Sequence, residues 1–393
     1  MIAVDTINAN RCLACSSGRM FDFFAYPEIP INVGMLCASY EQAIRAQRGQ
    51  LILANCENCG LVRNRAFNPD DIHFRPGYDA SLVHSPVIWL ASQHLASQLV
   101  ERFDLDGKSV LDIGCGQAHF LRHLCTQASI RAVGIDPSAV ASEESISDSH
   151  LRVIQDRLGE QHRDEIGDLI TCISVLEDIA NPESFLSSIR QMIGTRRSNL
   201  YFEVFRGFDA IVRGDVWSPH YEQCNYFSED SLCHLLRTAG FSVQRSGTVD
   251  QNSQYLFAEA LPAHGAVRVE PTKHHSNQAI ENFATIASLK VASWSERLER
   301  WSRARKRVFL WGSGGKATTL LSIVPEAAYI KAVVDINPNR QGQFTPCSAK
   351  EVISIEELDR RNPDIVLISN PAYRQEIATE LVSRGIACEL HVV

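Results

Sequence analysis

This sequence of 393 residues lacks the marks of several protein classes. No apolar run approaches about 18 residues, the length that a membrane-spanning helix needs, so no membrane partner is expected. Residues 1–5 show no basic region followed by an apolar core, so the sequence predicts no secretory signal and a cytoplasmic location. An excess of basic residues is also lacking. The net charge of −8 argues against nucleic acid as a partner.

Few of the twelve cysteines lie close to another cysteine in the sequence. Most stand singly in apolar segments, as Cys172 and Cys233 do, which is typical of buried thiols in a reducing compartment. Four others form two C-x-x-C pairs, Cys12 with Cys15 and Cys56 with Cys59. Two such pairs can supply a tetrahedral zinc site, which would be structural because four thiolates leave no open position. Redox pairs and unpaired buried thiols are the alternatives. Residues 51–54 and 61–62 are expected to form a small hairpin around the second pair.

The stretch from Ser109 to Leu121, S-V-L-D-I-G-C-G-Q-A-H-F-L, lacks the third glycine of a dinucleotide-binding loop. Its short apolar run nevertheless suits a buried strand, and a helical pattern begins at Ala118. Between them, Gly114 and Gly116 allow the backbone to approach a ligand closely. Strand, glycine turn and helix together are typical of the first unit of a nucleotide-binding sheet.

Further strands are predicted to follow this unit, over residues 132–135, 151–156, 168–175 and 199–204, with a final hairpin of 241–243 and 254–259. The second strand ends in Asp136 and Pro137, and an acid at this position suits two ribose hydroxyls. The third ends at Asp156 and the fifth at Glu203. The pattern predicts an α/β protein with a doubly wound sheet.

The motif D-I-G-C-G followed by G-I-D resembles the first two motifs of class I S-adenosylmethionine-dependent methyltransferases. An ordinary Rossmann-type unit that binds NAD, or nothing, is the alternative. The segment L-E-D-I-A-N-P resembles the family's L-E-H-I-x-x-P, with Asp178 where histidine is usual. The resemblance implies cofactor contacts from Asp112, Gly114, Gly116, Asp136, Pro137, Asp156, Ser174 and Leu176. Asp156 would receive the adenine amino group, unless it is a solvated loop acid. Tyr78 and Ser85 precede a predicted helix that would cover the cofactor, although both residues equally fit an exposed surface.

A second strand–glycine–helix unit begins at residue 307 and starts a smaller doubly wound domain. Its loop, Gly312-Ser-Gly-Gly-Lys316, lacks the order of a P-loop because Ala317 follows the lysine. Glycines and a lysine at a helix start can still hold a phosphate.

The whole chain resembles the three-domain S-adenosylmethionine-dependent sugar C-methyltransferases, which act on nucleotide-linked deoxysugars. The resemblance implies a zinc-binding module over 1–75, a methyltransferase core over 76–265, a connecting helix over 266–306 and a Rossmann-like domain over 307–393. The last domain would bind substrate, and the predicted substrate contacts are Glu203, Gly314, Lys316, Asn370 and Tyr373. A monomer or homodimer is expected.

The family's active segment precedes a Tyr-Phe-Ser run, here Tyr226 to Ser228. Gln223 occupies the position of the family's presumed general base, a histidine, and glutamine cannot accept a proton at neutral pH. This departure indicates a less characterised branch. The remaining candidate bases are His220, Tyr221 and Glu222. Methyl transfer to carbon, nitrogen or oxygen stays open, as do a non-sugar natural-product intermediate as acceptor and a non-catalytic binding protein.

Overall fold

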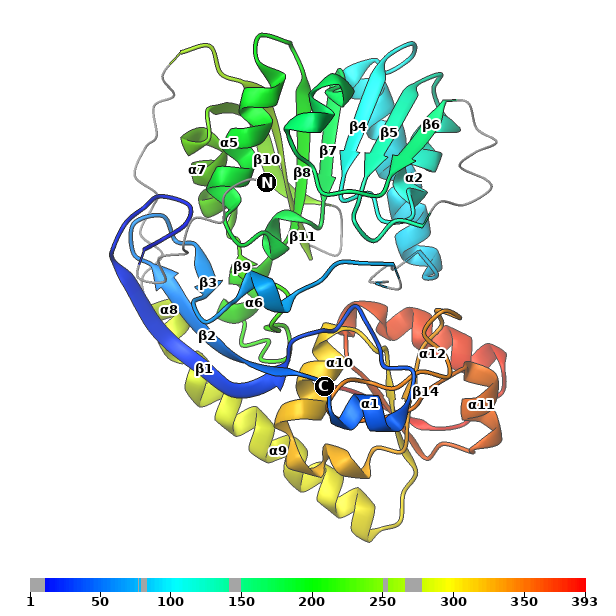
Figure 1. Ribbon diagram of the computed structural model, residues 1–393. Coiled ribbons are helices and arrows are strands. Elements are labelled where there is room, and N and C mark those ends of the chain that lie inside the picture. Colours follow the sequence, from blue (N-terminus) through cyan, green and yellow to red (C-terminus); the bar gives the residue numbers. More distant parts are fainter. Residues whose placement is uncertain (1–10, 77, 79–82, 141–149, 250–253, 266–277) are drawn as a thin grey trace. The chain divides into compact units, whose positions relative to one another are not determined.

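The computed structural model describes residues 11–76, 78, 83–140, 150–249, 254–265 and 278–393 (Figure 1). Contacts divide the chain into two compact units. Unit 1 comprises Met1–Asp22, Leu53–Asp209 and Cys224–Asn277, and unit 2 comprises Phe23–Ile52, Ala210–Gln223 and Gln278–Val393. The four-part division expected from the sequence stays a prediction, and residues 266–277 of its connecting segment lie outside the described residues.

Unit 1 is built on a seven-stranded sheet of the order β10-β11-β8-β7-β4-β5-β6. Its strands are β4 (Ser109–Ile113), β5 (Arg131–Ile135), β6 (Leu151–Ile154), β7 (Leu169–Ile173), β8 (Asn199–Phe205), β10 (Phe241–Val249) and β11 (Tyr255–Pro262). The five strands from β8 to β6 are parallel, whereas β11 runs antiparallel to β8 and to β10. The doubly wound sheet expected from the apolar runs is therefore confirmed.

Helices cover both faces of this sheet because its strands are apolar on both sides (Figure 1). They are α2 (Pro86–Phe103), α3 (His119–Cys125), α5 (Pro182–Ile193) and α7 (Glu229–Thr238), with the 3₁₀ turns η2 (Glu160–Glu165) and η3 (Leu176–Asp178). In β4, Val110 packs in a core with Leu99 of α2. The next residue, Leu111, packs in a second core with Ile189 of α5. Alternate side chains of one strand thus anchor helices on opposite faces.

A small sheet of the order β1-β2-β3-β9 accompanies the cysteine pairs. It consists of β1 (Met20–Pro30), β2 (Arg48–Cys56), β3 (Val62–Asn64) and β9 (Asn225–Tyr226). The predicted hairpin is present, because β2 pairs antiparallel with β3. The helix α1 (Tyr40–Ile44) lies between β1 and β2, and the turn η1 (Pro69–Asp71) follows β3.

Unit 2 contains a five-stranded parallel sheet of the order β14-β13-β12-β15-β16. Its strands are β12 (Val308–Trp311), β13 (Val333–Val334), β14 (Val352–Ile353), β15 (Ile365–Ile368) and β16 (Glu389–Val392). Its helices and turns are α8 (Gln278–Glu281), α9 (Phe283–Arg303), α10 (Gly315–Ile323), α11 (Ile355–Arg360), α12 (Arg374–Ser383), η4 (Pro325–Tyr329) and η5 (Pro371–Tyr373). The helix α6 (Gly207–Val212) spans the boundary between the units. Every residue of β12 and β15 is buried, as a strand covered on both faces requires.

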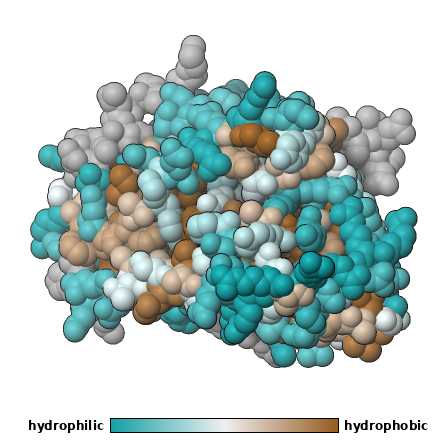
Figure 2. All heavy atoms as spheres, turned by 90° about the horizontal axis from the view of Figure 1, so that it is seen from below, coloured by the Kyte–Doolittle hydropathy of each residue, from teal (hydrophilic) through white to brown (hydrophobic). Residues whose placement is uncertain are grey.

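Within the described residues, no helix combines the length and apolar character needed to cross a membrane. Hydrophilic and hydrophobic residues are interspersed on the face seen in Figure 2. Large apolar side chains such as Leu289 on α9 and Val382 on α12 are exposed. Scattered exposures of this kind need no special explanation.

Candidate functional site

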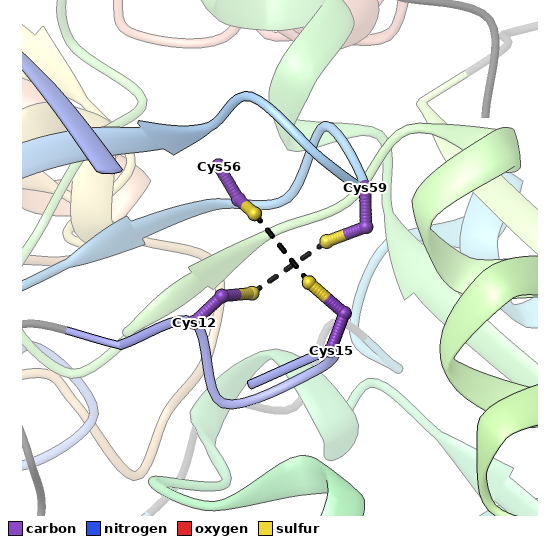
Figure 3. A group of neighbouring side chains, drawn as sticks. All are labelled: Cys12, Cys15, Cys56 and Cys59. Carbon is purple, nitrogen blue, oxygen red and sulfur yellow. Dashed lines mark hydrogen bonds between the residues drawn. The ribbon is translucent and has the colours of Figure 1, made fainter. Parts of the chain in front are cut away.

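The four predicted metal ligands gather at one point, with their side chains converging (Figure 3). Cys12 and Cys15 precede β1, Cys56 ends β2, and Cys59 lies in the turn before β3. That turn is tight because the N–H of Gly60 donates to the carbonyl of Cys56 over 2.8 Å, with a positive φ of 72° at Gly60. A glycine tolerates this left-handed conformation without strain.

The sulfur geometry fits a four-coordinate metal ion. The ligand atoms all lie within 4.8 Å of one another, with 3.5 Å between the sulfurs of Cys12 and Cys59 and 3.6 Å between those of Cys15 and Cys56. A tetrahedron with Zn–S bonds of about 2.3 Å places its sulfurs about 3.8 Å apart. The hydrogen bond with Cys12 is the largest of the effects that lower the pKa of Cys56 to about 7. Four adjacent thiols can all become thiolates only if a cation offsets their mutual repulsion.

The glycine turn after β4 faces the acid that ends β5. The N–H of Gly116 donates to Oδ2 of Asp136 over 2.9 Å, and Ser138 donates its N–H and hydroxyl to Oδ1 over 2.6 Å each. Gly114 and Gly116 both have positive φ angles, 74° and 51°. A Cβ atom on Gly114 would overlap the side chain of Val175, so this position requires glycine. The structure therefore joins three of the predicted cofactor residues at the carboxyl edge of the sheet.

Asp112, the last acid of β4, is buried rather than presented at the surface. The hydroxyl of Thr171 donates to its Oδ1 over 2.7 Å. Burial raises the pKa of Asp112 to about 7, with a smaller contribution from the charge of Asp136, while the Thr171 hydrogen bond lowers it. Asp112 therefore holds β4 against β7 and sits behind the glycine turn.

Other predicted cofactor residues lie around this edge with different exposures. Ser174 is exposed, has a φ of 53°, and donates its N–H to the carbonyl of Glu203 over 2.9 Å. Leu176 is buried and Pro137 is partly buried. Glu203 is also buried, and its Oε2 accepts from the Tyr201 hydroxyl over 3.0 Å.

The remaining three cofactor candidates have local partners. The exposed carboxylate of Asp156 accepts from the side chain of Gln161 and the N–H of Arg157, and these hydrogen bonds lower the pKa of Asp156. Ser85 is buried and caps α2, since its hydroxyl oxygen accepts from the N–H of Ile88. Tyr78 is partly buried and makes an edge-to-face ring contact with Phe74.

The predicted catalytic segment belongs to unit 2. Tyr221, Glu222 and Gln223 are buried, and His220 is partly buried. The ring of Tyr221 lies so close to Gly49 that a Cβ there would overlap it. Gly49 also belongs to unit 2, so this close approach lies within that unit.

Glu222 holds a loop that follows β1. Its Oε1 accepts from the N–H of Val33 over 2.9 Å, and its Oε2 accepts from the N–H of Gly34 over 3.1 Å. Hydrogen bonds of this kind favour the charged carboxylate over the protonated acid. The carboxylate is thus suited to fixing the backbone of residues 33 and 34.

His220 packs against the glycine loop of the second parallel sheet. Its Nδ1 lies 2.8 Å from the carbonyl oxygen of Ser218. A Cβ atom on Gly315 would lie 2.9 Å from the same Nδ1, so glycine allows the ring to approach the loop. Burial lowers the pKa of His220, and the hydrogen bond to Ser218 offsets part of this.

The predicted substrate residues of unit 2 have partners as well. Nζ of Lys316 lies 2.7 Å from a carboxylate oxygen of Asp215. Gly314 is exposed and caps α10 without a side chain, and Asn370 caps η5 by accepting from the N–H of Ala372. Tyr373 is partly buried, and burial raises its pKa to about 12.

Sequence reasoning missed the buried arginine that organises this glycine loop. The guanidinium of Arg340 donates to the hydroxyl and the carbonyl of Ser313 over 2.7 and 2.9 Å, and to the carbonyl of Val33 over 3.0 Å. Ser313 in turn donates its hydroxyl to Asp335. Asp335 ends a second strand just as Asp136 does, which was the available signal, whereas nothing local marks Arg340.

Two family models match the chain. Residues 89–246 match a methyltransferase domain, and residues 268–385 match a C-methyltransferase C-terminal domain. Together with the sheet order and the cysteine cluster, these matches show a class I methyltransferase α/β fold that carries an N-terminal Cys₄ cluster and a further parallel-sheet domain.

Individual relatives cover parts of the chain. A ubiquinone biosynthesis O-methyltransferase of Pseudomonas fluorescens (strain SBW25) is 32% identical over 24% of this chain and 43% of its own length. A tRNA U34 carboxymethyltransferase of Sulfurovum sp. (strain NBC37-1) is 30% identical over 25% of this chain and 35% of its own. The chain thus matches less than half the length of either relative.

Solved structures are similar at lower identity. The 1,6-didemethyltoxoflavin-N1-methyltransferase of Burkholderia thailandensis is 19% identical, over 45% of this chain and 81% of its own, with a TM-score of 0.35. The magnesium protoporphyrin IX methyltransferase of Synechocystis PCC 6803 is 17% identical, over 44% and 82%, with a TM-score of 0.35.

Proposed function

We propose that this protein is an S-adenosylmethionine-dependent methyltransferase that acts on a small molecule, most specifically a nucleotide-linked or phosphorylated sugar. The observation that carries the proposal is the meeting of Gly116 with the carboxylate of Asp136 at the carboxyl edge of a class I methyltransferase sheet. Ligands of open α/β sheets bind at this edge. The match to a methyltransferase domain over residues 89–246 supports the same cofactor.

Different parts of the cofactor would be bound by different groups of the chain. Gly114 and Gly116 would let its amino-acid part approach the backbone, and Asp136 would accept from the ribose hydroxyls. Asp156, which is exposed at the end of β6, would accept from the adenine amino group. The cofactor itself supplies an electrophilic methyl group. The chain's own residues then have to hold the acceptor in line and manage its proton.

A structural zinc ion is part of this proposal. Cys12, Cys15, Cys56 and Cys59 have the spacing and donor chemistry that zinc prefers. All four positions of a tetrahedral ion would be filled by thiolates, so the metal would stabilise its module and take no part in methyl transfer.

Among the candidate bases, His220 is favoured over Glu222. The carboxylate of Glu222 is already engaged by two backbone N–H groups. The Nδ1 atom of His220 faces a carbonyl oxygen, so it carries the hydrogen and leaves Nε2 as the basic nitrogen. Burial also lowers the pKa of His220, which keeps the ring neutral near pH 7. Gln223 would orient the acceptor or donate to an enolate oxygen.

The chemical nature of the methyl acceptor is inferred from the residues of unit 2. The match of residues 268–385 to a C-methyltransferase C-terminal domain supports carbon as the methylated atom. Methylation of carbon beside a ketone requires removal of a proton, which is the role proposed for His220. Gly314 and Lys316 are the proposed contacts for a phosphate group, with Asn370 and Tyr373 beside the second sheet. Because Lys316 is paired with Asp215, a phosphate would have to compete for its ammonium group.

A mass-spectrometric screen tests the proposal. The purified protein is incubated with S-adenosylmethionine and a panel of uridine and thymidine diphosphate sugars, and products heavier by one methylene group are sought. Asp136→Asn serves as a control that should form less product because it binds the cofactor more weakly. Methylation of unphosphorylated natural-product intermediates alone would replace the sugar by another small metabolite. Cofactor binding without any methylated product across both panels would leave a binding protein and refute the enzyme.

A further inference from the structure

Arg63 of β3 is a buried cation that forms no ion pair within the part of the chain that the structure describes. Its side chain is among the largest fully buried ones, and the residue is 1% exposed. Nε and Nη1 of its guanidinium have no hydrogen-bond partner among the described residues. An isolated charge in a protein interior is strongly unfavourable unless it is paired. The position therefore calls for a group of opposite charge.

The register of the hairpin places Arg63 beside the cysteine cluster. Arg63 pairs with Ala54 in β2, and the ladder continues two residues further, where the N–H of Cys56 donates to the carbonyl of Leu61. Opposite residues of an antiparallel pair share one face, and so do residues two apart along a strand. Arg63 and Cys56 thus lie on the same face, one repeat of about 7 Å apart along the strand. A long arginine side chain can span this distance.

A metal-bound cysteine cluster would supply the negative charge that the buried guanidinium of Arg63 requires. Four thiolates around one divalent ion leave a net charge of −2, and this charge would sit in the same apolar core as Cys12, Cys56 and Cys59. Desolvation lowers the pKa of Arg63, whereas negative charge on the neighbouring thiols of Cys224 and Cys12 would raise it. The nearby cation Arg65 acts in the opposite sense to those thiols, and it lies further out, paired with Asp22.

We propose that Arg63 is the counter-charge of a zinc–tetrathiolate centre and positions that centre against β9. The inference rests on the proposed zinc site, but it is independent of the methyl acceptor. The metal site would then also support β9, because β3 pairs with β9 through Val62 and Tyr226 and through Arg63 and Asn225.

The strand β9 is held from the other side by the turn after β7. The N–H of Cys224 donates to the carbonyl of Glu177 over 3.0 Å, and the side chain of Asn225 donates to the carbonyl of Ile179 over 2.8 Å. The N–H of Asn64 also donates to the carbonyl of Cys224 over 2.9 Å. The two residues that follow Gln223 are thus clamped between the metal module and the carboxyl end of β7.

The test is the Arg63→Met substitution in the full chain, with Arg65→Met as the matched control. Zinc content is measured by elemental analysis, and zinc release by a chromogenic chelator. Melting is followed with zinc bound and after chelation.

Loss of a group that supports metal ligands typically weakens metal affinity about 10–100-fold. Arg63→Met should therefore weaken zinc binding and melt earlier than wild type when loaded. After chelation it should melt no earlier than wild type, because the unpaired buried charge is gone. Arg65→Met should match wild type in zinc release.

Several outcomes would overturn the inference. Wild-type zinc release from Arg63→Met, or later melting of that variant with zinc bound, would show that Arg63 does not balance the centre. If inorganic phosphate stabilises the zinc-free wild type but not the zinc-free variant, the partner of Arg63 is a small anion instead. A wild-type protein without zinc would refute the metal site itself, which separates that failure from the failure of Arg63. If Arg63→Met does not fold, Arg63→Lys keeps the charge and should release zinc at a rate closer to wild type than Arg63→Gln does. Equal rates for these two variants would count against the proposal.

Discussion

The Nδ1 atom of His220 lies 2.8 Å from the backbone carbonyl oxygen of Ser218. A carbonyl oxygen can only accept a hydrogen bond, so Nδ1 carries the proton and Nε2 is the nitrogen that can take one up. Because burial lowers the pKa of His220, the neutral ring persists to a lower pH than that of an exposed histidine. The segment before β9 therefore contains a neutral histidine whose basic nitrogen is Nε2, which fits the base proposed above.

Replacing His220 by glutamine should lower kcat by about 10²–10⁴-fold, the usual cost of removing a general base. Cofactor affinity, measured by calorimetry, should stay unchanged. The wild-type rate should fall as the pH drops through the lowered pKa of His220, so its acid limb should lie below the ordinary histidine value of about 6.5. The variant should lack that limb. Near-wild-type turnover of the variant would favour an amine acceptor that loses its proton to water.

Glu222→Gln should destabilise the fold more than it affects the proton-transfer step. The carboxylate accepts from the N–H groups of Val33 and Gly34, and an amide oxygen can replace only part of this. Loss of one charge-assisted hydrogen bond costs about 1.5–3 kcal/mol of unfolding free energy, which denaturant unfolding would measure. Glu28→Gln, at an exposed position of β1, is the matched control. A fall in kcat as large as that of the His220 variant, with unchanged stability, would make Glu222 the base.

Asp136→Asn should weaken the binding of S-adenosylmethionine by about 1.5–3 kcal/mol, because a neutral amide replaces the carboxylate that would accept from the ribose. Calorimetry measures the affinity. Circular dichroism checks that the turn held by Gly116 and Ser138 still folds. Asp106→Asn is the control, since this exposed acid accepts from the N–H of Ser129. Unchanged affinity in the Asp136 variant would remove this residue from the cofactor site.

Cys12→Ser should reduce the zinc content from about one ion per chain and lower the melting temperature, because one thiolate ligand is lost. Elemental analysis and thermal melting measure the two effects. Cys388→Ser, at a partly buried single cysteine, should keep both values. Full zinc and unchanged melting of the Cys12 variant would refute the metal site.

Gln223→His tests why this chain differs from the family's segment. Gln223 is buried beside Glu222, so a new imidazole would meet little water. If Gln223 only orients the acceptor, histidine should leave kcat nearly unchanged or lower it on the native acceptor. A steep rise in kcat would instead identify a weakened C-methyltransferase whose base had been lost.

Local patterns were enough to predict the sheets and the two cysteine pairs of the cluster. Each signal spans only a few residues: the apolar run before Gly114, the acid at Asp136 and the two C-x-x-C pairs. The spacing within each signal is enough to predict a strand, a turn or a pair of metal ligands. These signals can be read from the sequence because the local main-chain conformation depends on residues that are adjacent in the chain. The helix α10 was equally visible from the glycines before it.

Partners that are distant in the sequence could not be predicted. Glu222 accepts from Val33 across 189 residues, and Lys316 reaches Asp215 across 101. No periodicity links such positions, since packing of separate segments brings them together. Glu222 stays a candidate base from the sequence, and the structure adds that its carboxylate accepts from the backbone of residues 33 and 34.

The sequence by itself determined which residue types are available at which strand ends: glycines and an acid after two neighbouring strands, thiols in two pairs, and glutamine where a histidine is usual. Tertiary structure alone decided their chemical state. It set the tautomer of His220, the hydrogen bonds of Glu222 and the burial of Arg63 in the core. The physical reason is that ionisation and hydrogen bonding depend on desolvation and on nearby dipoles, and these are properties of packed surroundings and not of neighbours along the chain.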